Sequence, residues 1–177
     1  MMKKLILITT FSLLFLPKIY GQETYQTFTA EGFKVKCGCK LYENTTLTSI
    51  AKQQGVDNIL TAYICAENDD NPDIGLINNI NIYDESKSYK NIRQSDYAYY
   101  ENKYLEEYAT KLKNAGISYT YSTYQGVTSI EYIFDQQGLP TKAIIFLKNK
   151  KSYHLQVATR NNLKSKFNSL KSSFVIL

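Results

Sequence analysis

The five residues from Ala143 to Leu147, Ala-Ile-Ile-Phe-Leu, are apolar at every position and constrain the fold most strongly. Successive side chains of a β-strand point to opposite faces of its sheet, so such a strand must be covered on both faces. Strand-like segments flank it, and turn-type residues separate these segments at 125–126, 136–140 and 149–151. The sequence therefore predicts an antiparallel meander with further layers packed on both sides.

Other segments supply the remaining elements of this arrangement. Alternating or β-rich composition predicts strands at 33–41, 58–67 and 76–83. Helical periodicity and terminal signals predict helices at 44–55, 95–116 and 161–173. We predict an α+β fold, a three-layer α/β/α sandwich whose mainly antiparallel sheet has about six or seven strands.

The N-terminus has the layout of a secretory signal. Lys3 and Lys4 precede an apolar run from Leu5 to Leu16, and Pro17 ends that run. The run is shorter than the roughly 18 to 20 residues that a membrane-spanning helix needs. We predict a signal peptide at residues 1–21 and a single domain at 22–177. The protein is then secreted or periplasmic, without a transmembrane span.

Charge argues against a nucleic-acid partner. The whole chain has 21 basic and 16 acidic residues, a net charge of +5. Cleavage would remove Lys3, Lys4 and Lys18, which leaves 18 basic against 16 acidic residues and a net charge of +2. Nucleic-acid binding draws on clustered Lys and Arg. The acidic segment at 67–75 lacks calcium-loop spacing and is interpreted as a solvated turn.

The cysteines are predicted to be structural. In FKVKCGCKLYE, residues 33–43, Cys37 and Cys39 continue an alternation that places apolar residues on one face. An exported protein favours a disulfide to Cys65, with Cys37–Cys65 slightly preferred and Cys39 as the alternative partner or remaining thiol. Either bond closes a loop of about 27 to 29 residues and stabilises the fold by about 3 kcal/mol.

A tyrosine stripe marks the long helix at 95–116. It is a candidate ligand surface, although packing of amphipathic rings on a sheet explains the same pattern more simply. Glu101 falls inside the apolar arc and Tyr99 outside it, and the pattern explains neither. The stripe consists of Tyr97, Tyr100, Tyr104 and Tyr108.

His154 is the only histidine, so a Ser/His or Cys/His mechanism would have to use it. It shares a strand face with Gln156, and no nucleophile-elbow motif accompanies it. A zinc site of three cysteines and His154 would draw its ligands from three separate strands. We therefore expect no catalytic residue, no metal site and no cofactor, and interpret His154 as structural.

The two ends of the predicted domain resemble a known family. GFKV at 32–35 and KKSYHLQVATRNNLKSKFNSLKSSF at 150–174 are similar to the PsbP-like/DcrB-like family of small exported α/β proteins. The similarity extends over most of residues 28–175 and concerns element order and a loose terminal motif. It implies a binding or assembly role without a shared active site. The Cys-x-Cys segment and the tyrosine-rich helix depart from the family pattern.

Our leading hypothesis is a non-catalytic exported binding or assembly module of the cell envelope. It would act as a monomer on an unknown protein or envelope component, through a sheet face or the tyrosine-lined helix. The alternative is a cysteine-based redox or copper-handling protein that uses Cys37 and Cys39. A hydrolase based on His154 is a third hypothesis.

Overall fold

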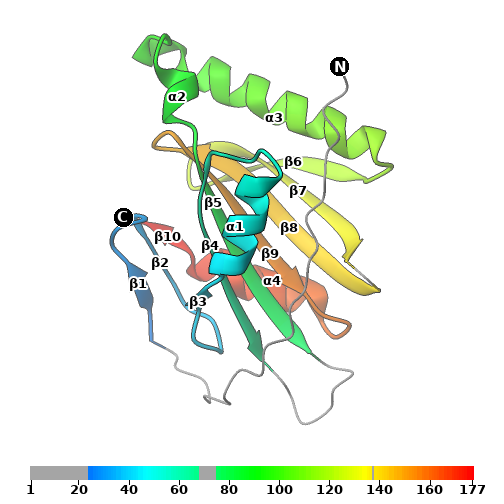
Figure 1. Ribbon diagram of the computed structural model, residues 1–177. Helices are drawn as coiled ribbons and strands as arrows, with labels where there is room; N and C mark the ends of the chain where they lie inside the picture. The colour runs from blue at the N-terminus through cyan, green and yellow to red at the C-terminus, as the bar shows by residue number, and fades with distance from the viewer. Residues whose placement is uncertain (1–23, 68–74, 137) are drawn as a thin grey trace.

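The computed structural model describes residues 24–67, 75–136 and 138–177. The predicted signal peptide at 1–21 lies outside the described residues, and so does most of the predicted turn at 67–75. Two sheets and several helices make up the described part of the chain (Figure 1).

The main sheet has seven strands in the order β3-β4-β5-β9-β8-β7-β6, and every neighbouring pair is antiparallel. The α+β class and the antiparallel meander of β6 to β9 are thereby confirmed. The strands are β3 (Tyr42–Glu43), β4 (Ile59–Glu67), β5 (Leu76–Asp84), β6 (Tyr119–Tyr124), β7 (Val127–Gln136), β8 (Leu139–Lys148) and β9 (Lys151–Ala158).

A second, three-stranded sheet joins the two ends of the domain. β2 (Phe33–Val35) pairs with β1 (Gln26–Phe28) and with β10 (Val175–Ile176). The predicted continuous strand at 33–41 is therefore wrong, because β2 ends at Val35 and β3 begins only at Tyr42. Burial nevertheless alternates through the connection, as the sequence predicts.

The helices lie close to their predicted positions. Asn44 caps α1 by accepting a hydrogen bond from the Leu47 backbone N–H at 2.9 Å. Beyond α3, Gly116 has φ +72°, the left-handed conformation predicted for it. The helical elements are α1 (Thr45–Gln53), α2 (Ser86–Tyr89), the 3₁₀ helix η2 (Gln94–Asp96), α3 (Tyr97–Asn114) and α4 (Leu163–Ser173).

Side chains of β8 divide between the two faces of the main sheet, as its composition predicts. Ile144 and Phe146 belong to a core that includes Phe167 of α4, and we call this side the α4 face. Ile145 and its neighbours of the same parity pack with Leu105 of α3 on the other side, the α3 face. Figure 1 also shows α1, which packs on β4, and α4 on opposite sides of the sheet.

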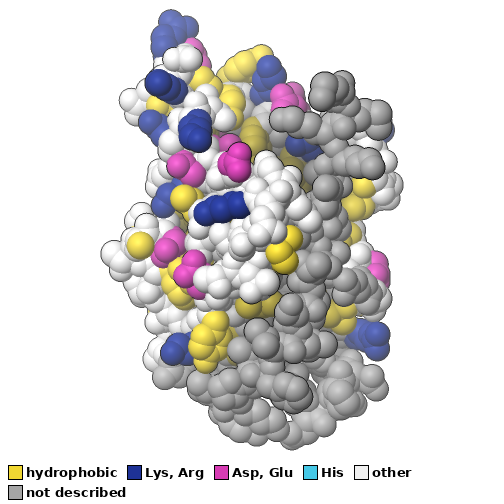
Figure 2. All heavy atoms as spheres, in the orientation of Figure 1, with side chains coloured by type: hydrophobic (Ala, Val, Ile, Leu, Met, Phe, Trp, Pro, Cys, Tyr) yellow, Lys and Arg dark blue, Asp and Glu magenta, His cyan; other side chains and the backbone are white. Residues whose placement is uncertain are grey.

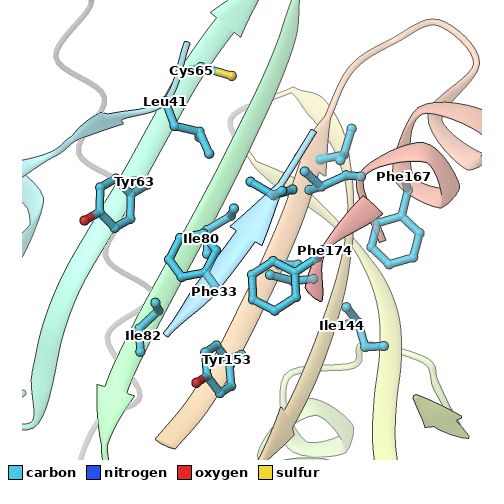
Figure 3. Close-up of a cluster of buried hydrophobic side chains, with 14 of the residues drawn as sticks. Phe33, Leu41, Tyr63, Cys65, Ile80, Ile82, Ile144, Tyr153, Phe167 and Phe174 are labelled. Carbon is cyan, nitrogen blue, oxygen red and sulfur yellow. The ribbon is translucent and has the colours of Figure 1, made fainter. Parts of the chain in front are cut away.

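The three-stranded sheet adds to the layer on the α4 face (Figure 3). The ring of Phe33 is fully buried and stacks on Phe174 of the chain terminus at 5.1 Å between centroids. It also meets the ring of Tyr63 from β4 at 5.8 Å. Aromatic packing therefore holds the first and last described segments against the main sheet.

Ion pairs also link α4 to the main sheet. The Glu131 carboxylate of β7 lies 2.9 Å from the ammonium of Lys142 and 2.5 Å from that of Lys171 on α4. Burial alone would raise the pKa of Glu131, but the two lysine hydrogen bonds outweigh burial and hold the pKa below its ordinary value. The ionised form is thus the one the fold stabilises.

We expect Glu131→Gln to lower the free energy of unfolding by about 1–2 kcal/mol at neutral pH. Because the pKa of Glu131 is lowered by folding, its contribution is complete above the ordinary pKa and disappears as the pH falls through the lowered one. Urea unfolding at neutral and acid pH measures this, with Glu107→Gln on the exposed side of α3 as the control. An equal loss at both pH values would contradict the charge argument.

Candidate functional site

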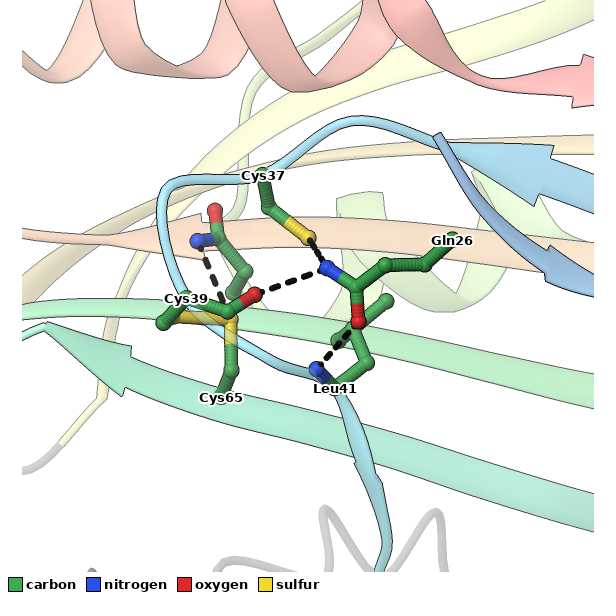
Figure 4. Close-up of a disulfide and its surroundings, with 6 residues drawn as sticks. Gln26, Cys37, Cys39, Leu41 and Cys65 are labelled. Carbon is green, nitrogen blue, oxygen red and sulfur yellow. Dashed lines mark hydrogen bonds between the residues drawn. A yellow bond between two sulfur atoms is a disulfide. The ribbon is translucent and has the colours of Figure 1, made fainter. Parts of the chain in front are cut away.

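The three cysteines lie together where the chain passes from β2 to β3 (Figure 4). Cys39 forms the disulfide with Cys65 of β4, and their Cα atoms are 5.8 Å apart. The preferred sequence prediction, Cys37–Cys65, is therefore wrong, and Cys37 retains its thiol. β2 ends at Val35 and the chain bends at Gly38 and Cys39. The Cys37 sulfur lies 3.5 Å from Gln26 Nε2, and the Cys39 sulfur is bonded to Cys65 of β4.

Gln26 of β1 braces this connection, a role that sequence analysis missed. Its Nε2 donates to the Cys39 carbonyl at 2.9 Å and lies 3.5 Å from the Cys37 sulfur. Its Oε1 accepts from the Leu41 backbone N–H at 2.8 Å. With Cys39 in the disulfide, this form of the protein does not offer the adjacent pair of thiols on which the redox or copper hypothesis relies.

The tyrosine stripe of α3 packs inward. Tyr104 donates to the Ser152 hydroxyl at 3.4 Å, and the hydroxyls of Tyr108 and Tyr132 share a hydrogen bond of 2.8 Å. Tyr97 and Tyr100, the other two members, meet the Tyr89 ring of α2 edge-on at 4.8 and 4.7 Å. All four rings are partly buried, so the packing interpretation accounts for them, and a ligand surface on the stripe stays a prediction.

Glu101 and Tyr99, the two residues that periodicity did not explain, have different surroundings. The Tyr89 hydroxyl donates to the Glu101 carboxylate at 3.0 Å. Burial raises the pKa of Glu101, and this hydrogen bond opposes the increase. Tyr99 is 74% exposed, so it contributes little to the core. A tertiary contact with α2 thus explains an acidic residue within an apolar arc.

A group of uncharged polar side chains occupies the α3 face between β5 and β9. Asn81 is the cross-strand partner of His154, and Asn79 is the partner of Gln156. His154 lies opposite Ile145 in the next ladder, which places it on the α3 face. We call Asn79, Asn81, His154 and Gln156 the amide–imidazole quartet. The same rows continue as apolar residues on β8 and β7.

Two members of the quartet are buried with an unpartnered polar atom. Asn81 is 7% exposed and His154 is 8% exposed. Within the described part of the chain, neither Asn81 Oδ1 nor His154 Nε2 has a hydrogen-bond partner. Buried polar groups are nearly always hydrogen-bonded, and leaving one unpaired costs about 1–3 kcal/mol. Each of these two atoms therefore has the capacity to bind a hydrogen-bonding partner other than the described residues.

Aromatic rings enclose the imidazole. The His154 ring lies 4.7 Å from the Tyr83 ring of β5 and 5.6 Å, edge-on, from the Tyr108 ring of α3. Burial lowers the pKa of His154 to about 3, so the imidazole is neutral at physiological pH. Both of these ring contacts are with tyrosines. In a Ser-His-Asp triad a carboxylate would contact the imidazole instead and orient it as the base.

An acidic group close to the Tyr83 ring already has partners. Glu85, just beyond the end of β5, is 5% exposed. Its carboxylate accepts from Asn58 Nδ2 at 3.0 Å and from the Ser152 hydroxyl at 3.4 Å. Burial raises its pKa, and these hydrogen bonds oppose that increase. Glu85 therefore supports the strand end beside the quartet.

We expect wild-type protein to lose about 2 kcal/mol more stability than His154→Phe when the pH falls from about 7 to about 5. The unfolded imidazole gains a proton below its ordinary pKa, whereas the folded one resists protonation down to about pH 3. The contribution of the neutral imidazole to the free energy of unfolding is thus complete above the ordinary pKa of histidine. It decreases as the pH falls below that value. Urea unfolding of both proteins measures the difference, and Glu85 and Glu101 titrate in both. If wild type and His154→Phe lost the same free energy of unfolding over this pH range, the folded protein would not hold His154 in its neutral form.

Sequence analysis did not predict the quartet, and it interpreted His154 as structural. The parity of β9 correctly placed His154 and Gln156 on one face. Asn79 and Asn81 were missed, although they alternate with isoleucines in NNINI and so occupy one face of β5. Polar residues alternating within an otherwise apolar central strand were the available signal.

The fold of this chain is similar to that of solved structures. The solution structure of cyanobacterial PsbP (CyanoP) from Synechocystis sp. PCC 6803 is similar to this chain. The two share 12% sequence identity with a TM-score of 0.49, over 94% of this chain and 100% of that chain. No protein-family model matches the sequence, and no curated protein does. Membership of the PsbP-like family stays a prediction.

The described residues have two further properties, one of their helices and one of their surface charge. No helix among residues 24–67, 75–136 and 138–177 is long and apolar enough to cross a membrane. On the visible, described part of one side, basic and acidic side chains are interspersed rather than grouped by sign (Figure 2). This distribution agrees with the weak net charge expected of the mature chain.

Proposed function

We propose that the protein is an exported, non-catalytic binding module of the cell envelope and that it binds through the amide–imidazole quartet. The observation that carries the proposal is the pair of buried, unpartnered atoms, Asn81 Oδ1 and His154 Nε2. A ligand that hydrogen-bonds both atoms would recover the free energy that burial costs.

The remainder of the same face supports a binding role for these residues. Beyond His154 the row across the sheet continues with Ile145 of β8 and Ile130 of β7, both fully buried in the core beneath α3. A face that served packing alone could continue this apolar pattern onto β5 and β9. It instead carries four polar side chains without charge.

The quartet also has an accessible end. Asn81 and His154 are buried, whereas Asn79 and Gln156, one row further along the sheet, are only partly buried. A ligand would therefore meet the outer pair first. Reaching the inner pair would require the side chains that cover it, among them the rings of Tyr83 and Tyr108 against His154, to move aside.

We expect Asn81→Leu to leave the ligand-free protein as stable as wild type or to stabilise it by about 1 kcal/mol. Leucine has a similar volume and removes a buried oxygen that lacks a partner. Sites kept for function commonly gain stability when their polar groups are replaced, whereas structural hydrogen-bonding residues lose it. Urea unfolding without ligand measures the change. A loss of about 2 kcal/mol or more would indicate a structural role and count against the site.

Binding itself is tested by affinity capture from native envelope extract. Wild-type protein should retain a component that Asn81→Leu and His154→Phe retain about tenfold less. Asn168→Leu, on the exposed side of α4, is the matched control and should capture as wild type does. Equal capture by all four proteins would refute the quartet as the binding site. N-terminal sequencing of the secreted protein tests export, with Gln22 as the expected first residue.

A further inference from the structure

We propose that the ligand of the amide–imidazole quartet is a neutral saccharide, an inference that rests on the binding function proposed above. The first argument concerns hydrogen-bonding capacity. Asn81 Oδ1 can only accept, so the ligand must present a donor there. His154 Nε2 accepts or donates according to the tautomer. A hydroxyl group does both, and a sugar ring carries several hydroxyls side by side.

Absence of charge from the quartet and its flanking rings is the second argument. Asn79, Asn81, Gln156 and the two tyrosines carry no charge at neutral pH, and the burial of His154 favours its neutral form. An ionised ligand would lose its hydration here without gaining a counter-charge. Glu85, the nearby carboxylate, already accepts from Asn58 and Ser152. A neutral polar ligand avoids this desolvation cost.

The rings beside the imidazole give the third argument. Tyr83 is tilted 47° to the His154 ring, and Tyr108 approaches it edge-on at 84°. Together they add apolar ring surface to a site whose floor is polar. A pyranose ring matches this combination, because its hydroxyls project around the rim and its C–H groups form apolar faces. Peptide amides would instead need an extended row of backbone partners.

The spacing of the two rows indicates the size of the ligand. Residues two apart on a strand are about 7 Å apart, so Asn79 and Asn81 are separated by that distance along β5. A ligand that contacts both rows must extend over about this distance, which a single pyranose ring with its hydroxyls can do. A disaccharide can place one ring on the buried pair and the next on the partly buried pair, so disaccharides are the probes we choose.

The test is an NMR titration of the purified protein with three neutral disaccharides: cellobiose, maltose and N,N′-diacetylchitobiose. At least one should produce saturable shifts in the side-chain amides of Asn79, Asn81 and Gln156, with a Kd on the order of 1 mM. Asn81→Leu and His154→Phe should each weaken binding about tenfold, and Asn168→Leu should not. Thermal melting beforehand establishes that each variant is folded.

Two results would overturn the inference. One is the absence of saturable shifts at the quartet with all three disaccharides; the other is tighter binding of glucuronate or glucosamine, which carry a charge. Failure here is distinguishable from failure of the proposed function. If quartet variants lose the captured envelope component while the disaccharides do not bind, the binding site stands and the saccharide assignment falls.

Discussion

Replacing Phe33 with alanine should lower the free energy of unfolding by about 3–5 kcal/mol. Phe33 is fully buried, and its ring contacts Phe28 at 4.6 Å, Phe174 at 5.1 Å and Tyr63 at 5.8 Å between centroids. These partners belong to β1, to the segment after α4 and to β4. Alanine would leave a cavity where the three-stranded sheet meets the main sheet, and the surrounding side chains cannot close it fully.

Urea unfolding of Phe33→Ala measures this loss, with Tyr99→Ala as an aromatic control. Tyr99 is 74% exposed, so its replacement should change stability by less than about 0.5 kcal/mol. Phe33→Leu fills most of the volume and should fall between the two. If Phe33→Ala were as mild as Tyr99→Ala, the two sheets would not share the core shown in Figure 3.

The segment after Phe33 shows what periodicity can and cannot predict. Alternation of apolar and polar residues correctly predicted which side chains between 33 and 41 are buried. It did not predict that the chain changes sheets, with β2 pairing to β1 and β10 and β3 pairing to β4. Alternating burial depends only on local side-chain direction, whereas a strand also needs a hydrogen-bonding neighbour. Distant segments of the chain supply those neighbours.

The long helix gives a similar contrast. Helical periodicity correctly placed Leu105, Ala109 and Leu112 on the buried side of α3. Periodicity did not explain Glu101 within the apolar arc, because its partner, the Tyr89 hydroxyl, belongs to α2. A carboxylate in an apolar arc is acceptable once such a donor is present. The sequence pattern of one helix contains no information about that donor.

The candidate site could not be predicted from the sequence, because sequence patterns do not specify which strands pair or in which register. Each half of the quartet is visible as a pair of polar residues at alternate positions, Asn79 and Asn81 on β5 and His154 and Gln156 on β9. Only the antiparallel pairing of β5 with β9 brings the halves together. These strands are far apart in the chain, and the helix α3 and the strands β6 to β8 intervene. Periodicity therefore placed His154 and Gln156 on one face without identifying the site.

The second large effect concerns the disulfide. Cys39→Ala should lower the free energy of unfolding by about 3 kcal/mol, because it opens the loop between Cys39 and Cys65, which are 26 positions apart. Cys37→Ala should cost less than about 1 kcal/mol. That change removes the contact between Gln26 and the Cys37 sulfur and part of the packing of a half-buried side chain, while Gln26 retains its bonds to the Cys39 carbonyl and the Leu41 N–H.

Thiol counting distinguishes the two cysteines independently of stability. When unfolded without reductant, wild type should expose one thiol and Cys37→Ala none, because the Cys39–Cys65 bond persists in both. Cys39→Ala, purified under reducing conditions, should expose two. A Cys37–Cys65 bond would instead leave Cys37→Ala with two thiols and make Cys37→Ala the more destabilising change. Both sulfurs lie on one face of the sequence pattern, so alternation could not distinguish Cys37 from Cys39 as the partner of Cys65, whereas these two measurements can.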